Sequence, residues 1–469
     1  MKKRIAAEWE PAKGVMIAYP ISLPRSLVCE LAKDTQIYLL CPDDTDEINK
    51  AKDLMTKFGI DAKTVKYLRV PKGDDATWPR DWGPHPLFTE KGEYKFLGPS
   101  YVLSTPFCGP EHDAPLTCAP WLDEPKPIDE FEGDTSDDLT AAAIAEQLDI
   151  DFIKLPFAFT GGNVLSDGID SILSTEVLLL ENKFKGFRER EFFGDVALIS
   201  GMNNYSIFSD YEDYSLQHVD TLLKMLDAHR LLVLRPPEDH PLFQRYEDIV
   251  NNEISHALNS YGRPWEVLRM DTGVLSDGEG MASYVNSLIL NKCIYVPMYG
   301  IPEDEKALQQ WEAAMPGYNI KGFEFVLAEE PDAYNPDDLY SEIGWDPGDV
   351  LHCRTRAVWD SEMLFMHSGL IDKVVNPEEE YICHVKIRDY SKSGLISDEL
   401  KVFYRKAGTS NWESSNLIAL PTRETYRAEI PVGDPGDTVE YYFAAADHSG
   451  RRATLPPTAP EGFYKFAIK

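Results

Sequence analysis

The sequence predicts an α/β domain followed by a smaller all-β domain, and three observations support this prediction. The chain has 469 residues, which is more than one ordinary hydrophobic core accommodates. Over roughly the first 370 residues, short apolar runs that stop at a proline alternate with helix-like stretches. After about Val375 the helix-like stretches end, and alternating strands with turn residues follow. The predicted domains are therefore 1–375 and 376–469.

Several elements of the first domain can be placed individually. Each expected strand is an apolar run bounded by a proline turn, and these runs are Val15–Tyr19, Ile37–Cys41, Leu231–Arg235 and Ile294–Val296. The expected helices are Thr45–Phe58, Leu139–Leu148, His240–Tyr261 and Glu303–Met315, with Asp239 as the cap of the third. The alternation predicts several similar α/β units, although the residues themselves show no repeat.

The second domain is predicted to be a β-sandwich. The stretches "EEEYICHVKIRDY", "DELKVFYRKAG" and "DTVEYYFAAADHSGR" alternate between apolar and polar residues and are separated by turn residues. The last of them resembles the penultimate strand and hairpin of immunoglobulin-like modules appended to microbial enzymes. The Cys…Trp…Cys pattern of antibody domains is missing from the stretch, so an antibody-type domain is not expected.

Composition and charge exclude several classes of function. Acidic residues outnumber basic ones by 79 to 46, which gives a formal charge of −33. This charge argues against a nucleic-acid partner and would attract a cationic substrate, although a generally acidic proteome explains it equally well. No apolar run reaches the ~18–20 residues of a membrane helix, and the N-terminus lacks a signal-peptide core. We therefore expect no membrane partner and a cytoplasmic protein, or else the mature form of a secreted one.

The seven cysteines do not form a recognisable disulfide or metal pattern. No C-x-x-C or His-x-x-x-His pair is present, so neither a metal nor another cofactor is expected. Cys108 and Cys118 bracket one loop and could pair in an oxidising compartment or stay reduced in the cytoplasm. Most of the remaining cysteines lie in apolar runs and fit simple packing residues.

Cys353 differs from the other cysteines because it lies in the polar, basic stretch "GDVLHCRTR". A cysteine thiolate is a strong nucleophile, and Arg354 and Arg356 could lower its pKa or serve as ion-pair residues. His352 is its neighbour. If residues 351–355 are extended, His352 points to the opposite face. The activating base should then come from elsewhere in the chain.

Two other stretches carry candidate site residues. In "QHVD", a strand would project His218 and Asp220 to one face, as an acid/base and a charge anchor or as an ordinary surface pair. In "ATWPRDWGP", Asp81 and Trp78 offer a carboxylate and an aromatic surface to a guanidinium, unless Arg80 and Asp81 form an internal ion pair.

Two further stretches give weaker signals. "FTGGNVLSDG", residues 159–168, matches neither a dinucleotide nor a phosphate loop and predicts a tight turn in which Asn163 and Asp167 hold the loops. In "YVNSLIL", Asn286 stands at the start of an apolar strand, where asparagine is usually a turn former.

Taken in order, "TWPRDWGP", "TGGNVLSDG", "QHVD", "NSLILNKCIYVP" with "AMPGY", and "LHCRTR" resemble the guanidino-group-modifying superfamily. The similarity is to the family of agmatine deiminase and the Porphyromonas-type peptidylarginine deiminases, and especially to the latter branch. It implies a five-fold α/β propeller with a central active site and an immunoglobulin-like tail. It also implies Cys353 as nucleophile, His218 as general acid/base, Asp81 and Asp220 as guanidinium ligands, Asn286 as a positioning residue and Trp78 against the substrate stem.

The resemblance implies hydrolysis of peptidyl-arginine to peptidyl-citrulline through a covalent thiouronium, without a cofactor. The alternatives are an agmatine or free-arginine deiminase, or a non-catalytic binding protein on the same scaffold. The stretch Phe96–Pro120 contains no Arg or Lys, whereas the Porphyromonas-type enzymes carry arginines there for a substrate carboxylate. A preference for C-terminal arginine is therefore not expected. The expected partner is an arginine-containing peptide or protein, or a small guanidino compound. The sequence indicates neither the oligomeric state nor the role of the β-sandwich.

Overall fold

The computed structural model describes residues 1–71, 77–100, 116–117, 126–127, 136–184, 186–212, 217–275, 278, 280–325, 345, 350–371, 374–376, 381–431 and 433–469. Cys108 and Cys118 lie outside these ranges, so their pairing stays a prediction. The chain divides into two compact units. One comprises Lys2–Trp311 and Ile320–Trp359, and the other comprises Met1, Glu312–Asn319 and Asp360–Lys469. The division predicted at 375/376 remains a prediction.

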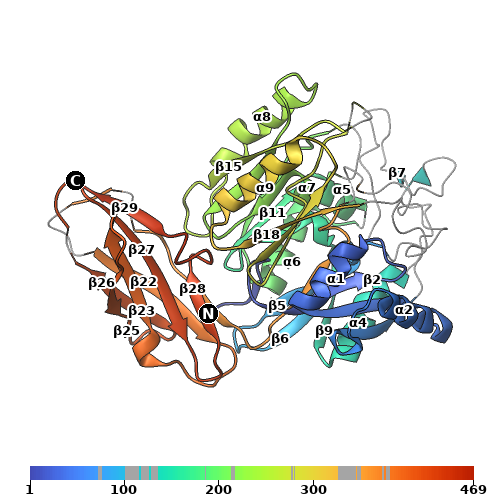
Figure 1. The fold of residues 1–469 in the computed structure, drawn as a ribbon, viewed down its shortest axis with the longest axis horizontal. Helices are drawn as coiled ribbons and strands as arrows, with labels where there is room; N and C mark the ends of the chain where they lie inside the picture. The colour runs from blue at the N-terminus through green and yellow to red at the C-terminus, as the bar shows by residue number, and fades with distance from the viewer. Residues whose placement is uncertain are drawn as a thin grey trace. The chain divides into compact units, whose positions relative to one another are not determined.

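The larger unit is built from small sheets, each with a helix in its crossover, which confirms the α/β class (Figure 1). In one of them, β10 (Leu165–Ser166) pairs antiparallel with β11 (Ser171–Thr175), and β11 pairs parallel with β12 (Asn204–Phe208). The parallel connection runs through α5 (Val177–Phe184) and α6 (Glu189–Ser200). A parallel pair needs such a crossover because its second strand must start again at the same end.

The same order recurs along the larger unit. A second sheet consists of β13 (Leu223–Met225), β14 (Arg230–Arg235) and β15 (Glu266–Asp271), with α8 (Phe243–Asn252) in the crossover. A third orders β16 (Leu288–Leu290), β17 (Cys293–Met298) and β18 (Asn319–Glu324), with α9 (Glu303–Ala314) between the last two.

Two further sheets have four strands each. One orders β1 (Arg4–Ile5), β5 (His85–Phe88), β6 (Tyr94–Ser100) and β9 (Asp151–Ala158), with α4 (Ser136–Leu148) before its last strand. The other orders β19 (Arg356–Trp359), β2 (Ala12–Ala18), β3 (Gln36–Pro42) and β4 (Val65–Val70), with α1 (Arg25–Asp34) and α2 (Thr45–Lys57) in the crossovers. The strands β7 (Leu116–Thr117) and β8 (Lys126–Pro127) form a separate pair.

Most of the expected elements are present, and two details of the prediction were wrong. The helix predicted over His240–Tyr261 is limited to α8, and Leu242 rather than Asp239 precedes it. The helix ends at two asparagines, whose side chains compete for backbone hydrogen bonds, although the apolar pattern continues into the short 3-10 helix Ile254–His256. The two prolines expected just after β3 and β17 lie within these strands. Pro42 is the last residue of β3, and Pro297 is the next-to-last residue of β17.

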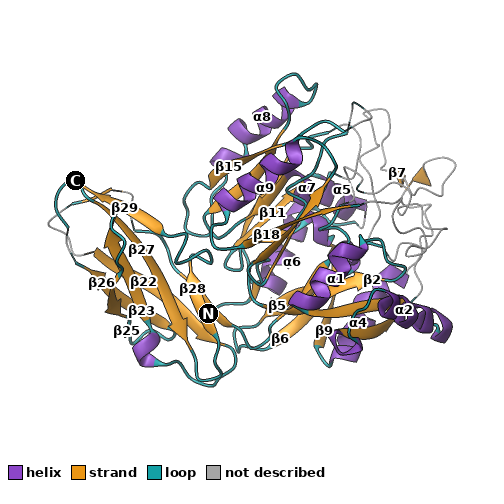
Figure 2. Cartoon of the chain, in the orientation of Figure 1, coloured by secondary structure: helices purple, strands orange, loops and turns teal. Residues whose placement is uncertain are grey.

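The smaller unit contains two sheets that share one core (Figure 2). The first orders β20 (Leu364–His367), β22 (Tyr381–Asp389), β26 (Thr425–Ile430) and β25 (Ile418–Ala419). The second orders β21 (Val374–Val375), β29 (Tyr464–Ile468), β27 (Thr438–Ala446), β23 (Lys401–Lys406) and β24 (Glu413–Asn416), with β28 (Arg452–Leu455) paired to β27. Alternate residues of β22 and β27 enter the shared core, as the period of two requires.

None of the helices in the described ranges is both long and apolar enough to cross a membrane.

Candidate active site

Cys353 lies in a tight turn immediately before β19, and its side chain is buried. The amide of Arg354 donates to the carbonyl of Val350 over 3.3 Å, and the amide of Thr355 donates to that of His352 over 3.2 Å. The expectation that residues 351–355 are extended was therefore wrong. The alternation of side chains that would have turned His352 to the opposite face does not apply to this turn.

Asn286 connects this turn to the start of β16. Its side-chain oxygen accepts the amide of His352 over 2.9 Å, and its Nδ2 lies 3.4 Å from the sulfur of Cys353. The side chain is fully buried, so water does not compete for these hydrogen bonds. The asparagine side chain thus contacts both the backbone of the turn and the thiol, and its positioning role stays a prediction.

Asp81 is carried by the short helix α3 (Pro79–Trp82), which begins with proline as helix N-termini often do. Its Oδ1 accepts the amide of Gly162 over 2.9 Å. The neighbouring Arg80 donates from Nε to the carbonyl of His352 over 3.1 Å and from its amide to the carbonyl of Cys353 over 3.2 Å. The helix α3 is therefore joined directly to the cysteine turn. Trp78 precedes α3 and is buried.

His218 and Asp220 lie at the start of another short helix, α7 (Val219–Leu222), and not on a strand as predicted. The side chain of Asn163 holds this end of the helix, because its Oδ1 accepts the amides of Val219 over 3.1 Å and Thr175 over 2.9 Å. The hydroxyl of Tyr211 donates to the carbonyl of His218 over 3.0 Å. The expectation that Asn163 holds a loop agrees with this arrangement.

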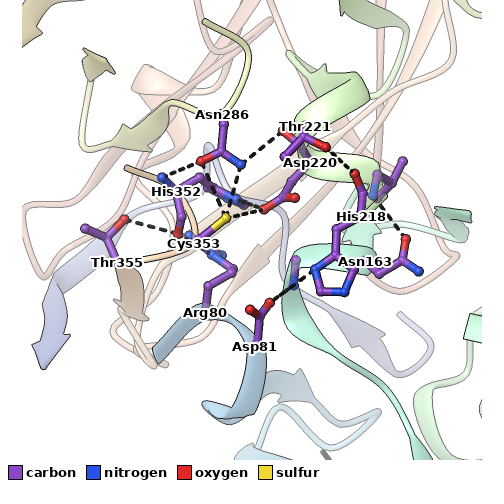
Figure 3. A network of polar contacts seen from close by, with 12 residues as sticks. Arg80, Asp81, Asn163, His218, Asp220, Thr221, Asn286, His352, Cys353 and Thr355 are labelled. Carbon is purple, nitrogen blue, oxygen red and sulfur yellow. Dashed lines mark hydrogen bonds and ion pairs between the residues drawn. The ribbon is translucent and has the colours of Figure 1, made fainter. Parts of the chain in front are cut away.

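The side chains of Asp81, His218 and Asp220 converge on Gly162. A Cβ atom built on this glycine would lie 2.7 Å from Asp81 Oδ1, 2.7 Å from His218 Nδ1 and 3.2 Å from Asp220 Oδ2. Figure 3 shows the carboxylates and the histidine around one space, with Cys353 and Asn286 at its edge. The structure thus brings together five of the predicted site residues from four separate segments of the chain.

His218 is buried and neutral at pH 7. Burial lowers the pKa of its imidazole to about 4, although the negative charge of Asp220 opposes this shift. Neither ring nitrogen has a hydrogen-bond partner within the described part of the chain, and Nδ1 lies 3.6 Å from Asp81 Oδ1. A neutral imidazole with a lone pair directed into the site can accept a proton from a substrate or a thiol.

The surroundings of Asp220 favour its ionised form. Burial alone would raise the pKa of its carboxyl, but hydrogen bonding and charge from His352 outweigh this and lower it, with smaller help from His218 and Lys224. Oδ2 lies 2.6 Å from His352 Nδ1 and 3.9 Å from the sulfur of Cys353. Oδ1 is buried and has no hydrogen-bond partner among the residues described. An ionised oxygen in this position is suited to a cation.

The two arginines that follow the cysteine support the surrounding loops. Nη1 of Arg354 donates to the carbonyl of Ser22 over 2.8 Å, and its guanidinium lies over the rings of Trp345 and Phe325. Nε of Arg356 donates to the carbonyl of Pro84 over 2.9 Å, and its Nη1 donates to the carbonyl of Arg80. These contacts favour the structural interpretation over direct stabilisation of a thiolate.

Three residues near the site were not predicted as site residues, namely Glu8, Lys224 and Gly162. Glu8 lies just after β1, and its Oε2 is 3.0 Å from both Nε2 of His352 and Nζ of the buried Lys224. Gly162 was interpreted only as part of a turn. Contacts between residues this distant in the sequence leave no local pattern, so only a known family motif could have identified them.

Known proteins resemble this chain in sequence and in fold. The profile of the family described as Porphyromonas-type peptidyl-arginine deiminase matches residues 4–326. This range contains Asp81, His218, Asp220 and Asn286 and ends before Cys353. A Mycoplasma mycoides protein, whose assignment as an agmatine deiminase is inferred, is 23% identical over 285 residues, covering 56% of this chain and 72% of that protein.

Solved structures share the fold. The agmatine deiminase of Enterococcus faecalis matches with a TM-score of 0.57 at 17% identity, covering 76% of this chain and 96% of that one. Campylobacter jejuni agmatine deiminase with substrate bound matches with a TM-score of 0.55 at 15% identity, covering 76% and 96%. The sequence and fold are those of the guanidino-group-modifying superfamily. Within it, the chain belongs to the Porphyromonas-type peptidyl-arginine deiminase family.

The low pKa of His218 predicts a pH dependence of stability. The unfolded chain binds a proton at this residue below an ordinary pKa of about 6.5, whereas the folded chain does so only near 4. Stability should therefore fall as the pH drops from about 6.5 to 4, by roughly 1–3 kcal/mol from this residue. Chemical denaturation of wild type and His218→Gln across this range measures the effect. If the free energy of unfolding changed with pH in the same way for wild type and variant, the result would contradict this prediction.

Proposed function

We propose that the protein is a cysteine-dependent deiminase that hydrolyses the guanidinium group of a small compound such as agmatine. The observation that carries this proposal is the convergence of the buried side chains of Asp81, His218 and Asp220 on Gly162, with the sulfur of Cys353 3.9 Å from Asp220 Oδ2. Buried acceptors without partners are costly unless a ligand satisfies them. A guanidinium supplies a positive charge and several N–H donors in one plane, which two carboxylates can bind together.

The choice of a small substrate is supported by the relatives named as agmatine deiminases. Peptidyl-arginine, the first choice from the sequence, is the second candidate, and the description of the family favours it. Both substrates present the same guanidinium to the site and differ only in the groups at the far end of the alkyl stem.

The proposal includes the finer architecture. The recurring order of strands and crossover helices in the five sheets of the larger unit, taken over the described residues, supports a five-fold α/β propeller. Two sheets around a common core in the smaller unit support an immunoglobulin-like sandwich. The predicted domains 1–375 and 376–469 belong to the same proposal.

In the proposed reaction, Asp220 Oδ1 and Asp81 accept the N–H groups of the guanidinium. Cys353 transfers its thiol proton to His218 and attacks the central carbon, so that a C–S bond forms and the C–N double-bond electrons move to nitrogen. Protonated His218 returns the proton to the leaving nitrogen, the C–N bond breaks, and ammonia departs from a thiouronium. Water then gives a proton to His218 and attacks the same carbon. The hydroxyl proton of the adduct passes to the sulfur as the C–S bond breaks, leaving a ureido product and the cysteine thiol, and His218 gives its proton to the released ammonia.

A comparison of substrates tests the proposal. Purified protein is incubated with agmatine, free arginine and an arginine peptide blocked at both ends, and the ureido product and ammonia are measured. We expect agmatine to have the highest kcat/KM, by roughly tenfold or more, because its free amine adds a positive charge that an acidic protein attracts. Free arginine also carries a carboxylate, and the blocked peptide lacks the second positive charge. Preference for the blocked peptide would favour the second candidate. Absence of ureido product from all three would contradict the proposed function.

A further inference from the structure

The imidazole of His352 lies between two carboxyl groups from separate parts of the chain. Its Nδ1 is 2.6 Å from Oδ2 of Asp220, and its Nε2 is 3.0 Å from Oε2 of Glu8. The side chain of His352 has no exposed surface, and that of Glu8 is 10% exposed. Figure 3 shows His352 to the left of Asp220, beside Cys353. Both distances are those of good hydrogen bonds.

These two contacts determine a minimum number of protons. A neutral imidazole has one N–H and one lone pair, and an ionised carboxylate can only accept. With a neutral ring and two ionised carboxylates, one of the two contacts would bring lone pairs together without a proton between them. In a buried site such a contact is strongly repulsive.

We propose that Glu8, His352 and Asp220 form a chain that holds one proton beyond those of a neutral imidazole and two carboxylates. In this chain His352 is a positioning residue for Asp220, the guanidinium ligand. The extra proton lies on the second ring nitrogen or on one of the carboxyl oxygens. Each arrangement supplies a donor at both contacts, and the proposal holds for all of them.

The charges around the chain are compatible with this count. Four ionisable groups face His352, namely Asp220 from α7, Glu8, Lys224 from β13 and Arg80 from α3. Burial and the charges of Arg80 and Lys224 lower the pKa of the ring overall, although the charge of Glu8 and the hydrogen bond to Asp220 oppose this shift. Glu8, His352 and Asp220 with their extra proton carry one negative charge. The ammonium of Lys224, 3.0 Å from Glu8, balances this charge. The chain and its lysine are then neutral together.

The chain also determines which oxygen of Asp220 meets the substrate. Oδ2 is bound to His352, so Oδ1, which has no partner among the described residues, remains for a guanidinium N–H. The backbone of His352 is fixed as well, because its amide donates to Asn286 Oδ1 over 2.9 Å. Orientation of Asp220 therefore depends on His352, and loss of the extra proton leaves a donor for only one of the two contacts of the ring. This consequence rests on the proposed function, whereas the proton count does not.

Nuclear magnetic resonance on the full-length protein without substrate tests the proton count. Histidine ring nitrogens and aspartate and glutamate carboxyl carbons are isotope-labelled, and the signals of the chain are assigned by their loss in His352→Gln and Glu8→Gln. At pH 7.5 we expect either two N–H groups on the His352 ring, or one N–H together with one protonated carboxyl. A ring with a single N–H beside two ionised carboxyls would overturn the proposal.

Kinetics provide a second, independent measurement. His352→Gln should raise KM for the guanidino substrate on the order of tenfold, with a smaller change in kcat, because Asp220 is no longer oriented before binding. Wild-type kcat/KM should fall at alkaline pH as the chain loses its proton, and this decline should be absent in His352→Gln. An unchanged alkaline decline in the variant would contradict the positioning role even if the proton count holds.

Discussion

Cys353→Ala is expected to lower kcat by roughly 10⁴-fold or more, because it removes the group that forms the covalent intermediate. The fold should be little affected, since the turn around the cysteine is held by backbone bonds and by Asn286 Oδ1 on the amide of His352. Cys29→Ala is the matched control, because Cys29 lies half-buried on α1, away from the site residues, with its sulfur 3.5 Å from the carbonyl of Phe58. The control should keep wild-type activity and a similar melting temperature.

Covalent labelling sharpens this prediction. An amidinium compound with a reactive halomethyl group resembles a guanidinium and alkylates a nearby thiol, and mass spectrometry locates the adduct. We expect one equivalent on Cys353 and protection by substrate. Burial raises the pKa values of Cys41 and Cys383 to about 12, so these thiols should stay unlabelled at neutral pH. Labelling of another cysteine with retention of activity in Cys353→Ala would contradict the assigned nucleophile.

Much of the α/β fold could be predicted from the sequence because its strands are buried. β3 and β14 are short continuous apolar runs, and α2 has its own side-chain cap at Asp44. The end of α8 could not be predicted, since an apolar pattern continues past the residues where the chain turns. Strand order and register depend on contacts between distant segments, which a local pattern does not contain.

The site shows a different limit. Asp81, His218, Asp220, Asn286 and Cys353 were identified by their chemistry and by their resemblance to a family, and the structure brings them together. The local conformations assumed for two of these segments were wrong, because α7 and the cysteine turn are held by long-range bonds from Asn163 and Asn286. Glu8 and Gly162 were missed for the same reason, since their importance lies entirely in what surrounds them.

Gly162→Ala is expected to lower kcat/KM by roughly 10³-fold, through one added methyl group. The new Cβ would lie 2.7 Å from both Asp81 Oδ1 and His218 Nδ1, distances that real Cβ atoms do not reach. These neighbours cannot easily yield, because Asp81 accepts the amide of Gly162 itself and His218 begins α7. Moving them by several tenths of an ångström would misplace the guanidinium ligands and the proton acceptor together, and catalysis is steeply sensitive to such displacements.

The matched control is Gly194→Ala on α6, where an added Cβ meets no atom within 4 Å. Because alanine favours helix, this variant should be slightly more stable than wild type and fully active. Steady-state kinetics with the best substrate and thermal unfolding of both variants provide the comparison. We expect Gly162→Ala to remain folded, since the clash is confined to three side chains, and to lose Cys353 labelling by the amidinium probe along with turnover. If Gly162→Ala kept activity within a few-fold of wild type, the space around Gly162 could not be where the guanidinium binds, and the site would have to lie elsewhere along the cysteine turn.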